Sequence, residues 1–253
     1  MKVVRFAVAG RVHTGEARGG VLLDEAGRAY QGDDVVWLPP VEPRQVIGLA
    51  LNYADHASEL SLDAPPEPAL FFKPITSLVG HRAPVVYPTG AQYMHYEIEL
   101  AVVIGRRCRK VTAAHAYDVV RGYTICNDCT VRDFVHNFYR PPVKAKGFDT
   151  FGPCGPWLVE GEIERPEGLV LTTRVNGEVR QQGNTNQLMR SIPELIAYIT
   201  DFMTLDRDDM ILTGTPKGIS PVHPGDVITM EISRIGVLEN RIVADDGAIA
   251  SGR

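Results

Sequence analysis

The sequence predicts an α+β fold with a β-dominated core, and three features of the chain support this prediction. Short apolar and β-branched runs bounded by glycine or proline outnumber the segments with helical periodicity. The run Ile98–Ile104 is too apolar and β-branched to be a solvated edge, so we expect a buried strand there. The segments that carry a helix start signal are few and short. At 253 residues, the chain is long enough to bury a substantial core.

The first part of the chain is expected to be a small β-structure. Residues 1–38 form short strand-like runs separated by the turn signals Ala9-Gly10 and Arg18-Gly19-Gly20. Three prolines follow within a few residues, at positions 39, 40 and 43. They predict a boundary between an N-terminal β-appendage, residues 1–43, and a main domain, residues 44–253.

Strand and helix signals are mixed from residue 45 onward. Val46–Leu51 is a short apolar strand, and Asn52 or Asp55 can cap a helical turn that runs to Leu60. Thr130 can likewise cap a helix from Val131 to about Phe138.

The best helix signal is the capping box of Ser191 and Glu194, with Pro193 early in the helix. The apolar positions that follow at helical spacing are Ile192, Leu195, Ile196, Ile199, Phe202 and Met203.

A hairpin is predicted upstream of this helix. Leu169–Val175 and Glu178–Gln182 flank the two-residue turn Asn176-Gly177, which is typical of tight hairpins. Later strands are expected at Met210–Leu212, Val227–Ile232 and Asn240–Ala244.

Two glutamates interrupt the buried strand around Ile98. Glu97 and Glu99 lie two residues apart, so their side chains share one face of a strand. Burying two like charges is costly unless a cation or hydrogen bonds compensate them. Asp128 follows another apolar, strand-like run, and three converging carboxylates would suit Mg²⁺, Mn²⁺ or Ca²⁺. The alternative is that one glutamate faces solvent or pairs with a lysine.

Composition excludes several classes of protein. A net charge of −5 gives no reason to expect a nucleic-acid partner, and no apolar run is long enough for a membrane span. Arg5 interrupts the short apolar run at the start, so no secretory leader is expected and the chain is predicted to be cytoplasmic. Cys126 and Cys129 form a lone CxxC, which is interpreted as structural rather than as a redox motif or half a zinc site.

Four motifs occur in order along the chain. They are Asn52-Tyr-Ala-Asp-His-Ala-Ser-Glu59, Phe72-Lys-Pro74, His95-Tyr-Glu-Ile-Glu-Leu100 with Asn127-Asp128, and Leu212-Thr-Gly-Thr-Pro-Lys-Gly218. Together they resemble the fumarylacetoacetate hydrolase superfamily over roughly residues 45–245. Within this superfamily, the stretch from Tyr93 to Val159 most resembles the homoprotocatechuate-pathway 5-oxopent-3-ene-1,2,5-tricarboxylate decarboxylases and 2-hydroxyhepta-2,4-diene-1,7-dioate isomerases. Tyr139–Asp149 is the most telling local match to that subgroup.

The resemblance implies a mixed β-roll of the fumarylacetoacetase C-terminal type, with short peripheral helices, as the catalytic domain. It further implies a homodimer, a small-molecule 2-oxo carboxylate substrate, and one Mg²⁺ or Mn²⁺ held by Glu97, Glu99 and Asp128. Ca²⁺ would be a structural substitute. No nucleic-acid or membrane partner is expected.

His56 and Glu59 are candidate catalytic residues. At a spacing of three they share a face of a helical turn, where Glu59 can orient His56 and raise its basicity. The resemblance implies the same water-activating or proton-transferring pair. The alternative is an exposed capping pair with no catalytic role.

The remaining candidates surround an anionic substrate. The resemblance implies that Lys73 and Lys146 line the site, Lys146 as a catalytic group, with Lys144 competing for that role. Arg132 can grip a carboxylate through two hydrogen bonds. Gly214 and Thr215 can offer a backbone N–H and a hydroxyl to a carboxylate of the substrate. The alternative, favoured if the other motifs are ignored, is that their loop is an ordinary turn after a strand. The histidines at positions 81, 95 and 136 are not included.

The expected activity is a divalent-metal-dependent decarboxylase, isomerase or both, acting on 2-oxo-3-ene di- or tricarboxylates of homoprotocatechuate and 4-hydroxyphenylacetate degradation. A dienolate at the metal site would be shared by both steps. Alternatives are a C–C hydrolase of the fumarylpyruvate or acylpyruvate type, or an oxaloacetate decarboxylase. The non-enzyme alternative is a degenerate family member that only binds a ligand.

Overall fold

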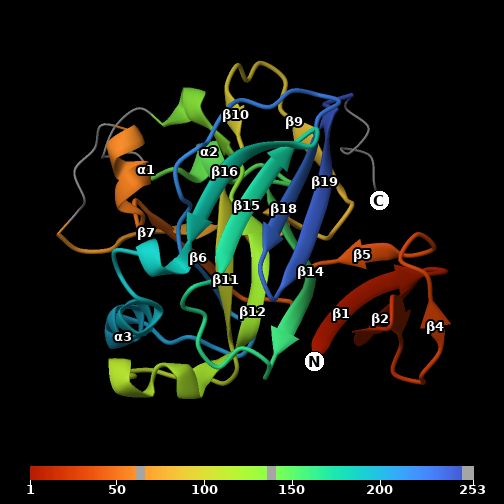
Figure 1. Ribbon diagram of the computed structural model, residues 1–253, viewed down its shortest axis with the longest axis horizontal. Coiled ribbons are helices and arrows are strands. Elements are labelled where there is room, and N and C mark those ends of the chain that lie inside the picture. Colours follow the sequence, from red (N-terminus) through yellow and green to blue (C-terminus); the bar gives the residue numbers. More distant parts are fainter. Residues whose placement is uncertain (61–65, 136–140, 247–253) are drawn as a thin grey trace.

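The computed structural model describes residues 1–60, 66–135 and 141–246, and strands dominate these residues (Figure 1). The strands are β1 (Lys2–Val8), β2 (Arg11–Arg18), β3 (Val21–Leu23), β4 (Ala29–Tyr30), β5 (Val36–Leu38), β6 (Val46–Ala50), β7 (Ala69–Lys73), β8 (Leu78–Val79), β9 (Pro84–Tyr87), β10 (Met94–His95), β11 (Ile98–Ile104), β12 (Val120–Asn127), β13 (Thr130–Val131), β14 (Gly152–Glu160), β15 (Val170–Val175), β16 (Glu178–Asn184), β17 (Met210–Leu212), β18 (Val227–Ile232) and β19 (Gly236–Ala244). The α-helices are α1 (Ala54–Glu59), α2 (Val143–Lys146) and α3 (Ile192–Phe202). Short 3₁₀ turns are η1 (Ile75–Ser77), η2 (Ala113–His115), η3 (Tyr117–Val119), η4 (Arg132–Phe134) and η5 (Thr185–Gln187). The predicted β-dominated fold is confirmed.

The central feature is a large mixed sheet built around β11 and β12. Its strand order is β4-β3-β2-β1-β14-β12-β11-β17-β6-β7, and β17 and β6 run parallel while β11 and β12 run antiparallel. A smaller sheet of order β16-β15-β18-β19-β9 covers part of it (Figure 1). Every residue of β11 is buried, as expected for a continuous β-branched run inside a core.

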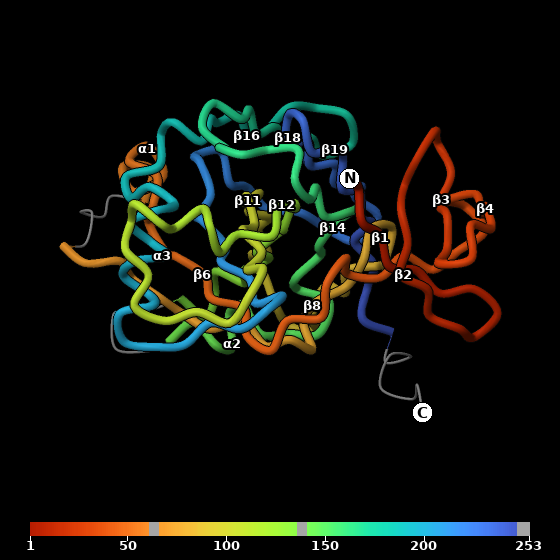
Figure 2. The backbone as a smooth tube through the Cα atoms, turned by 90° about the horizontal axis from the view of Figure 1, so that it is seen from below, coloured from red at the N-terminus to blue at the C-terminus, as the bar shows by residue number. Residues whose placement is uncertain are grey.

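The N-terminal strands form a separate lobe at one end of the molecule (Figure 2). β1 continues the large sheet by pairing with β14, with Lys2 opposite Val159 and Val3 opposite Leu158. β2 to β5 extend away from this junction, so the strands predicted for residues 1–38 are confirmed. The domain boundary at residue 43 stays a prediction.

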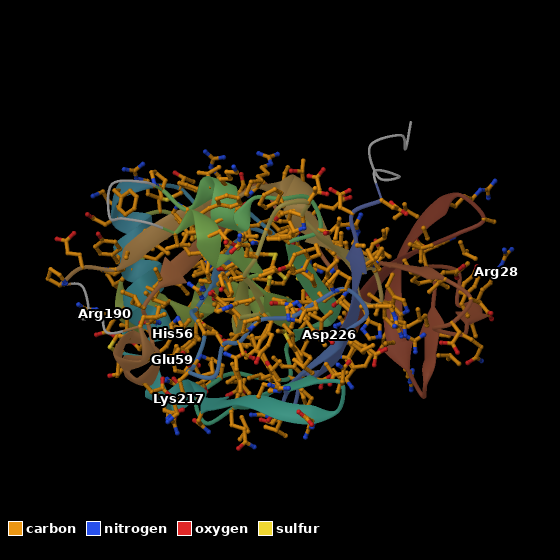
Figure 3. All side chains as sticks on the ribbon, turned by 90° about the horizontal axis from the view of Figure 1, so that it is seen from above. Arg28, His56, Glu59, Arg190, Lys217 and Asp226 are labelled. Atoms are coloured by element: carbon orange, nitrogen blue, oxygen red, sulfur yellow. The ribbon has the colours of Figure 1, made fainter. Side chains whose placement is uncertain are left out.

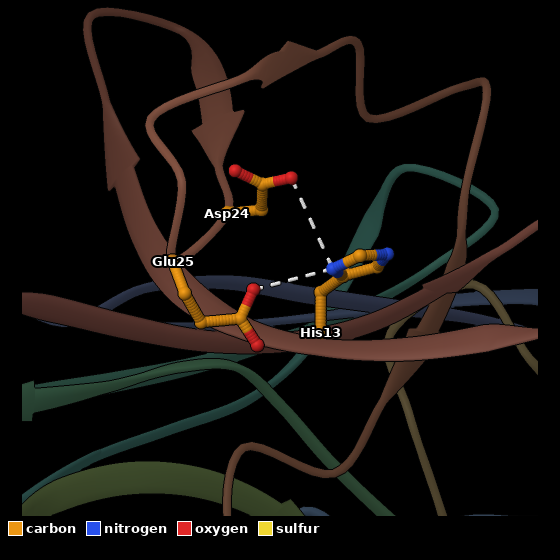
Figure 4. Close-up of side chains that lie close together, drawn as sticks. All are labelled: His13, Asp24 and Glu25. Carbon is orange, nitrogen blue, oxygen red and sulfur yellow. Dashed lines mark hydrogen bonds and ion pairs between the residues drawn. The ribbon is translucent and has the colours of Figure 1, made fainter.

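Within this lobe, His13 contacts two carboxylates at the β3–β4 turn (Figure 4). Its Nδ1 lies 3.2 Å from Glu25 Oε2 and 3.9 Å from Asp24 Oδ2. The Asp24 carboxylate also accepts the Tyr30 hydroxyl and the backbone N–H groups of Ala26 and Arg28. These contacts give the cluster of His13, Asp24 and Glu25 a structural role, because they stabilise the β3–β4 turn.

A histidine joins the lobe to the main domain. The ring of His81 lies edge-on to Trp37 at 4.9 Å between ring centroids, and its Nδ1 accepts the N–H of Glu239 at 3.1 Å. Burial and then the nearby Arg82 lower the pKa of His81 to about 4. The imidazole is therefore neutral and packed between the two parts of the chain.

We expect His81 to weaken the fold in acid. An unfolded histidine binds a proton below its ordinary pKa of about 6.5. The folded one resists protonation until pH falls to about 4. Its stabilising contribution is therefore complete above about pH 6.5 and is lost progressively down to the folded pKa, by about 3 kcal/mol at most. Urea unfolding of His81→Gln, which keeps an acceptor for Glu239, should show a smaller loss of stability from neutral pH to pH 4 than the parent. An equal loss in both proteins would contradict this assignment.

The helix of the Ser191 capping box is confirmed as α3. The Ser191 N–H donates to Glu194 Oε2 at 2.7 Å, and the Glu194 N–H donates back to the Ser191 hydroxyl. Most of the expected apolar face is buried, but Phe202 is 53% exposed because the helix ends there and its ring packs on Tyr198 at the surface.

The Asn176-Gly177 hairpin is confirmed as β15 and β16. Both turn residues have positive φ, 52° and 86°, as a two-residue hairpin turn requires. β18 is found as expected, and β19 starts four residues earlier than predicted, at Gly236.

Two local predictions are wrong. Thr130 does not cap a helix: Thr130–Val131 pairs with β10, and only the short turn η4 follows. Residues 136–138 of that predicted helix lie outside the described residues.

The helical turn before Leu60 exists as α1, but its N-cap is Tyr53, without a side-chain cap. The Asn52 side chain instead donates to the carbonyls of Arg190 and Thr213 and accepts the Arg190 N–H, so tertiary contacts outweigh its capping preference.

No helix in residues 1–60, 66–135 and 141–246 is long and apolar enough to cross a membrane.

Candidate active site

The site lies where β11 begins and β12 ends. The Asp128 N–H donates to the Glu97 carbonyl at 2.9 Å, and the Glu97 N–H donates to the Asn127 side chain at 2.9 Å. These two hydrogen bonds bring Asp128 beside Glu97 and Glu99, and one carboxylate oxygen from each residue lies within 4.8 Å of the others. All three side chains are buried. The convergence expected from the sequence is therefore present.

Three basic side chains surround the carboxylates. Lys73, at the end of β7, donates to Asp128 Oδ1 at 2.7 Å, and its side chain is fully buried. Lys146, at the end of α2, donates to Glu97 Oε2 at 3.0 Å and also to Asp128 Oδ2. Arg132, from η4, donates to the second oxygen of Glu97.

Glu97 and Glu99 have opposite electrostatic environments. Burial disfavours the charge of Glu97, but Lys146 and Arg132 outweigh this and hold the pKa of its carboxyl well below the usual range. Burial, followed by the neighbouring Asp128 and Glu97 charges, raises the pKa of the Glu99 carboxyl well above its usual range. The Gly214 N–H donates to Glu99 at 2.6 Å. Glu99 therefore carries the least compensated charge of the three.

These residues fit a divalent cation. The donor set consists of carboxylate oxygens, which Mg²⁺ and Mn²⁺ prefer. The raised pKa of Glu99 marks the place where a further positive charge would stabilise the site most. Glu97, Glu99 and Asp128 would hold such an ion.

The predicted histidine pair forms on α1. His56 Nδ1 lies 3.0 Å from Glu59 Oε2, and His56 is only 5% exposed, so the pair is not a loose surface contact. The second Glu59 oxygen accepts the Gly218 N–H at 2.9 Å. Figure 3 shows His56 and Glu59 next to Lys217 at the end of the molecule away from the N-terminal lobe.

The loop Thr213–Gly218 connects the two halves of the site. At its start the Gly214 N–H holds Glu99, and at its end the Gly218 N–H holds Glu59. Gly218 has a φ of +104°, and a side chain there would meet the Arg180 carbonyl. This loop therefore fixes the three clustered carboxylates relative to the histidine pair.

Gln181 fixes the middle of this loop and was not predicted. Its amide donates to Thr215 Oγ1 at 2.9 Å and to the Pro216 carbonyl at 2.8 Å. Its carbonyl accepts the N–H of Ile98, between the two glutamates, at 3.4 Å. Gln181 is 1% exposed. A glutamine in an otherwise exposed strand gives no sequence signal for this role.

We expect Gln181→Leu to lower kcat more than it raises KM, because the loop would lose the bonds that set the distance between Glu99 and Glu59. The unsatisfied Pro216 carbonyl and Ile98 N–H should also cost roughly 2 to 4 kcal/mol of stability. Steady-state kinetics at a temperature where both proteins are folded tests this. Gln182→Leu, an exposed neighbour on the same strand, is the matched control. Equal kinetics in the two variants would contradict the positioning role.

His95, which the sequence analysis left out of the candidate site, lies near it. Burial and then Arg132 lower its pKa to about 4, while the charges of Glu97 and Glu59 act in the opposite direction. The neutral imidazole therefore lies within electrostatic reach of both halves of the site. Its Nδ1 is buried, and in the described part of the chain it has no hydrogen-bond partner.

The other predicted residues are placed as follows. Lys146 uses its three N–H groups on Glu97, Asp128 and Thr130, so none is free for a substrate in this arrangement. Lys144 lies over the ring of Phe134 and makes no such contact with the carboxylates.

Lys73 and Thr215 of the Thr213–Gly218 loop are also engaged in hydrogen bonds with other protein groups. Lys73 contacts Asp128 and the Lys146 carbonyl, and Thr215 is held by Gln181. Arg132 keeps a buried Nε that has no partner among the described residues. Tyr139 and Arg140, which carried part of the subgroup resemblance, lie outside those residues. Cys126 and Cys129 are buried free thiols, consistent with a structural role.

Residues 45–243 match the family described as fumarylacetoacetate (FAA) hydrolase C-terminal. The chain belongs to this family. It is 50% identical over 204 residues to the 4-hydroxyphenylacetate degradation bifunctional isomerase/decarboxylase of Salmonella dublin. The aligned region covers 80% of this chain and 48% of that protein. The chain thus spans about half the length of that curated relative of the family.

Two solved structures are similar to nearly the whole chain. 5-Carboxymethyl-2-hydroxymuconate delta-isomerase from Mycobacterium smegmatis is 38% identical, with a TM-score of 0.87 and coverage of 97% of this chain and 99% of that one. Maleylpyruvate hydrolase from Sphingobium sp. SYK-6, solved with manganese(II) and pyruvate, is 30% identical, with a TM-score of 0.82 and coverage of 96% and 99%.

Proposed function

We propose that this chain is a divalent-metal-dependent isomerase and decarboxylase of unsaturated 2-oxo di- or tricarboxylates. The observation that carries this proposal is the buried carboxylate cluster of Glu97, Glu99 and Asp128, fixed by one loop beside the pair of His56 and Glu59.

The charge balance of the site favours a multiply anionic substrate. The three carboxylates are already faced by three side-chain cations, Lys73, Lys146 and Arg132. A divalent ion therefore gives the buried site a positive charge, and an anionic substrate is the natural compensation. A neutral substrate would leave that charge unpaired.

A divalent ion bound at Glu97, Glu99 and Asp128 would act as a Lewis acid on a 2-oxo carboxylate. The Arg132 side chain is 20% exposed, and its guanidinium can orient a second carboxylate of the substrate. Lys73 and Lys146 keep the ligating carboxylates in place, and their positive charge stabilises negative charge that develops on the substrate.

His56 is suited to proton transfer. When its Nδ1–H is donated to Glu59, Nε2 carries the lone pair and can take or return a proton. In isomerisation, the proton leaves one carbon and returns to another along the conjugated chain. In decarboxylation, the bond to the leaving carboxyl breaks, its electron pair enters the conjugated system, CO₂ departs, and a proton is added to carbon.

The relatives support this choice. The Salmonella dublin protein is named a bifunctional isomerase/decarboxylase, and the Mycobacterium smegmatis protein is named an isomerase. The manganese ion in the Sphingobium structure supports a divalent cofactor, with Mg²⁺ and Mn²⁺ both compatible with the donor set here.

A C–C hydrolase is the second candidate. The Sphingobium relative is named a maleylpyruvate hydrolase, and a His–Glu pair can also activate water. The same site would then cleave a dioxo acid into two carboxylic acids.

Product analysis distinguishes the two. The purified chain is incubated with Mg²⁺ or Mn²⁺ and, separately, with 5-oxopent-3-ene-1,2,5-tricarboxylate, 2-hydroxyhepta-2,4-diene-1,7-dioate and fumarylpyruvate. We expect metal-dependent release of CO₂ from the tricarboxylate and a shift of the double bond in the diene. Two carboxylic acids from fumarylpyruvate, with the other compounds unchanged, would overturn the proposal in favour of the hydrolase. EDTA-treated protein and Glu97→Gln serve as controls, and both should be inactive.

A further inference from the structure

A cavity lies between the N-terminal lobe and the rest of the chain. Its volume is about 590 Å³, and its walls include Trp37 and Trp157. This volume falls within the range of roughly 300–1,000 Å³ that is usual for small-molecule sites. None of the residues of the candidate active site lines it. The lobe and α1 lie at opposite ends of the molecule (Figures 1 and 2), so this cavity is a separate feature.

The two indole rings are held in place by the backbone. Trp37 Nε1 donates to the Gly32 carbonyl at 2.8 Å, and Trp157 Nε1 donates to the Ile235 carbonyl at 2.7 Å. A side chain at Gly32 would come within 3.0 Å of the Trp37 ring, and one at Gly236 within 2.8 Å of the Trp157 ring. Because the polar N–H groups are satisfied and each ring packs against a glycine, the apolar ring atoms that line the cavity are held in fixed positions for a ligand.

The charged groups of this cavity are mostly basic, although the chain has a net charge of −5. Lys2, Arg18 and Arg82 line it, against one acid, Asp33. Lys2 Nζ lies 4.3 Å from the centroid of the Trp157 ring, and Arg82 pairs with Asp33. Arg18 is exposed, and its guanidinium has no ion pair or hydrogen bond with any residue that the structure describes.

We propose that this cavity binds a planar aromatic monocarboxylate, with its ring against the indoles and its carboxylate toward Arg18 and Lys2. Aromatic rings stack or pack edge-on with indoles, and a carboxylate compensates the excess basic charge. This site does not depend on the activity proposed for the carboxylate cluster.

Intrinsic fluorescence reports on this cavity directly, because Trp37 and Trp157 are the two tryptophans of the chain and both line it. The full chain is titrated with benzoate, with its neutral analogue benzamide, and with the non-aromatic acid cyclohexanecarboxylate. We expect a saturable fluorescence change with benzoate, with a Kd below about 1 mM. The other two compounds should bind several-fold more weakly. A linear response, or equal binding of benzoate and benzamide, would overturn the proposal.

Two variants on one strand sharpen the test. Arg18→Gln should raise the Kd for benzoate about threefold to tenfold. Arg11→Gln removes an exposed arginine of β2 that does not line the cavity and should leave the Kd unchanged. Arg132→Gln, which removes a cation beside the carboxylate cluster, should also bind benzoate as the parent does. Loss of the fluorescence change in Arg132→Gln would place the ligand at the carboxylate cluster and refute a second site.

Discussion

Replacing His56 with alanine is expected to lower kcat by about 10²- to 10⁴-fold, the usual contribution of a general acid or base. The imidazole is buried, its Nδ1 is held by Glu59, and Glu59 is itself held by the Gly218 N–H. With Nδ1–H donated to Glu59, the ring would use Nε2 as the proton-accepting atom. Substrate binding should change little, because the cations around the carboxylates are untouched. Steady-state kinetics on the substrates named above would measure the effect.

Glu59→Gln should lower kcat almost as much as the loss of the imidazole. A glutamine has one carbonyl oxygen, and the Gly218 N–H competes for it. The glutamine NH₂ would then face His56 Nδ1 and favour the tautomer with a protonated Nε2, which cannot accept a proton.

The chain provides a matched control in His115 and Asp118. This pair has the same spacing of three and a similar separation, 2.9 Å, but both side chains are largely exposed. His115→Ala should keep full activity. If both alanine variants were equally active, the His56–Glu59 pair would have no catalytic role.

The sequence predicted those parts of the fold that local chemistry determines. Three elements were found where expected because residues within each segment determine its structure. They are α3 with the Ser191 capping box, the hairpin with the Asn176-Gly177 turn, and β11 with the apolar run Ile98–Ile104. The Thr130 signal failed because pairing with β10 competes with capping, and pairing depends on a strand 35 residues away in sequence from that threonine, at His95.

Within the site, the sequence identified the carboxylates but not what holds them. Glu97 and Glu99 share a face because they lie two residues apart, which periodicity alone predicts. Gln181 lies more than 80 residues from Ile98, and nothing in its neighbourhood distinguishes it from the exposed Gln182. Contacts of this kind arise only when the sheets pack together.

The lysines illustrate the same limit. Their presence could be matched to a family pattern, but the pattern says nothing about which atoms they contact. The structure directs Lys73 and Lys146 to the carboxylates themselves, with Lys146 fully engaged. A role in holding the buried carboxylates in place therefore accounts for the contacts of the two lysines better than a role as a free proton donor does.

The second large effect is expected at the two glutamates, where the same chemical change should have opposite consequences for metal-free stability. Glu99→Gln should raise the Tm of the metal-free protein. The charge of Glu99 is disfavoured by burial and by its two carboxylate neighbours, and a glutamine oxygen can still accept the Gly214 N–H. Removing the charge thus relieves a penalty without losing that hydrogen bond.

Glu97→Gln should lower the stability of the metal-free protein by about 3 kcal/mol, the usual cost of breaking a buried ion pair. Lys146 and Arg132 both direct positive charge at this carboxylate and keep its pKa low. Without the carboxylate, these buried cations lose their compensation.

Both variants should nevertheless lose the stabilisation that Mn²⁺ gives the parent protein, because each removes one anionic ligand. A ligand at 100 times its Kd stabilises a folded protein by about 2.7 kcal/mol, which is readily seen as a rise in Tm. Thermal unfolding of EDTA-treated parent, Glu99→Gln and Glu97→Gln, with and without Mn²⁺, separates ligand loss from fold loss. Glu231→Gln, on the exposed face of β18, is the control and should keep the Mn²⁺ response. If Glu99→Gln kept the response, the metal would bind elsewhere. If it lowered the metal-free Tm, Glu99 would be better compensated than its surroundings indicate.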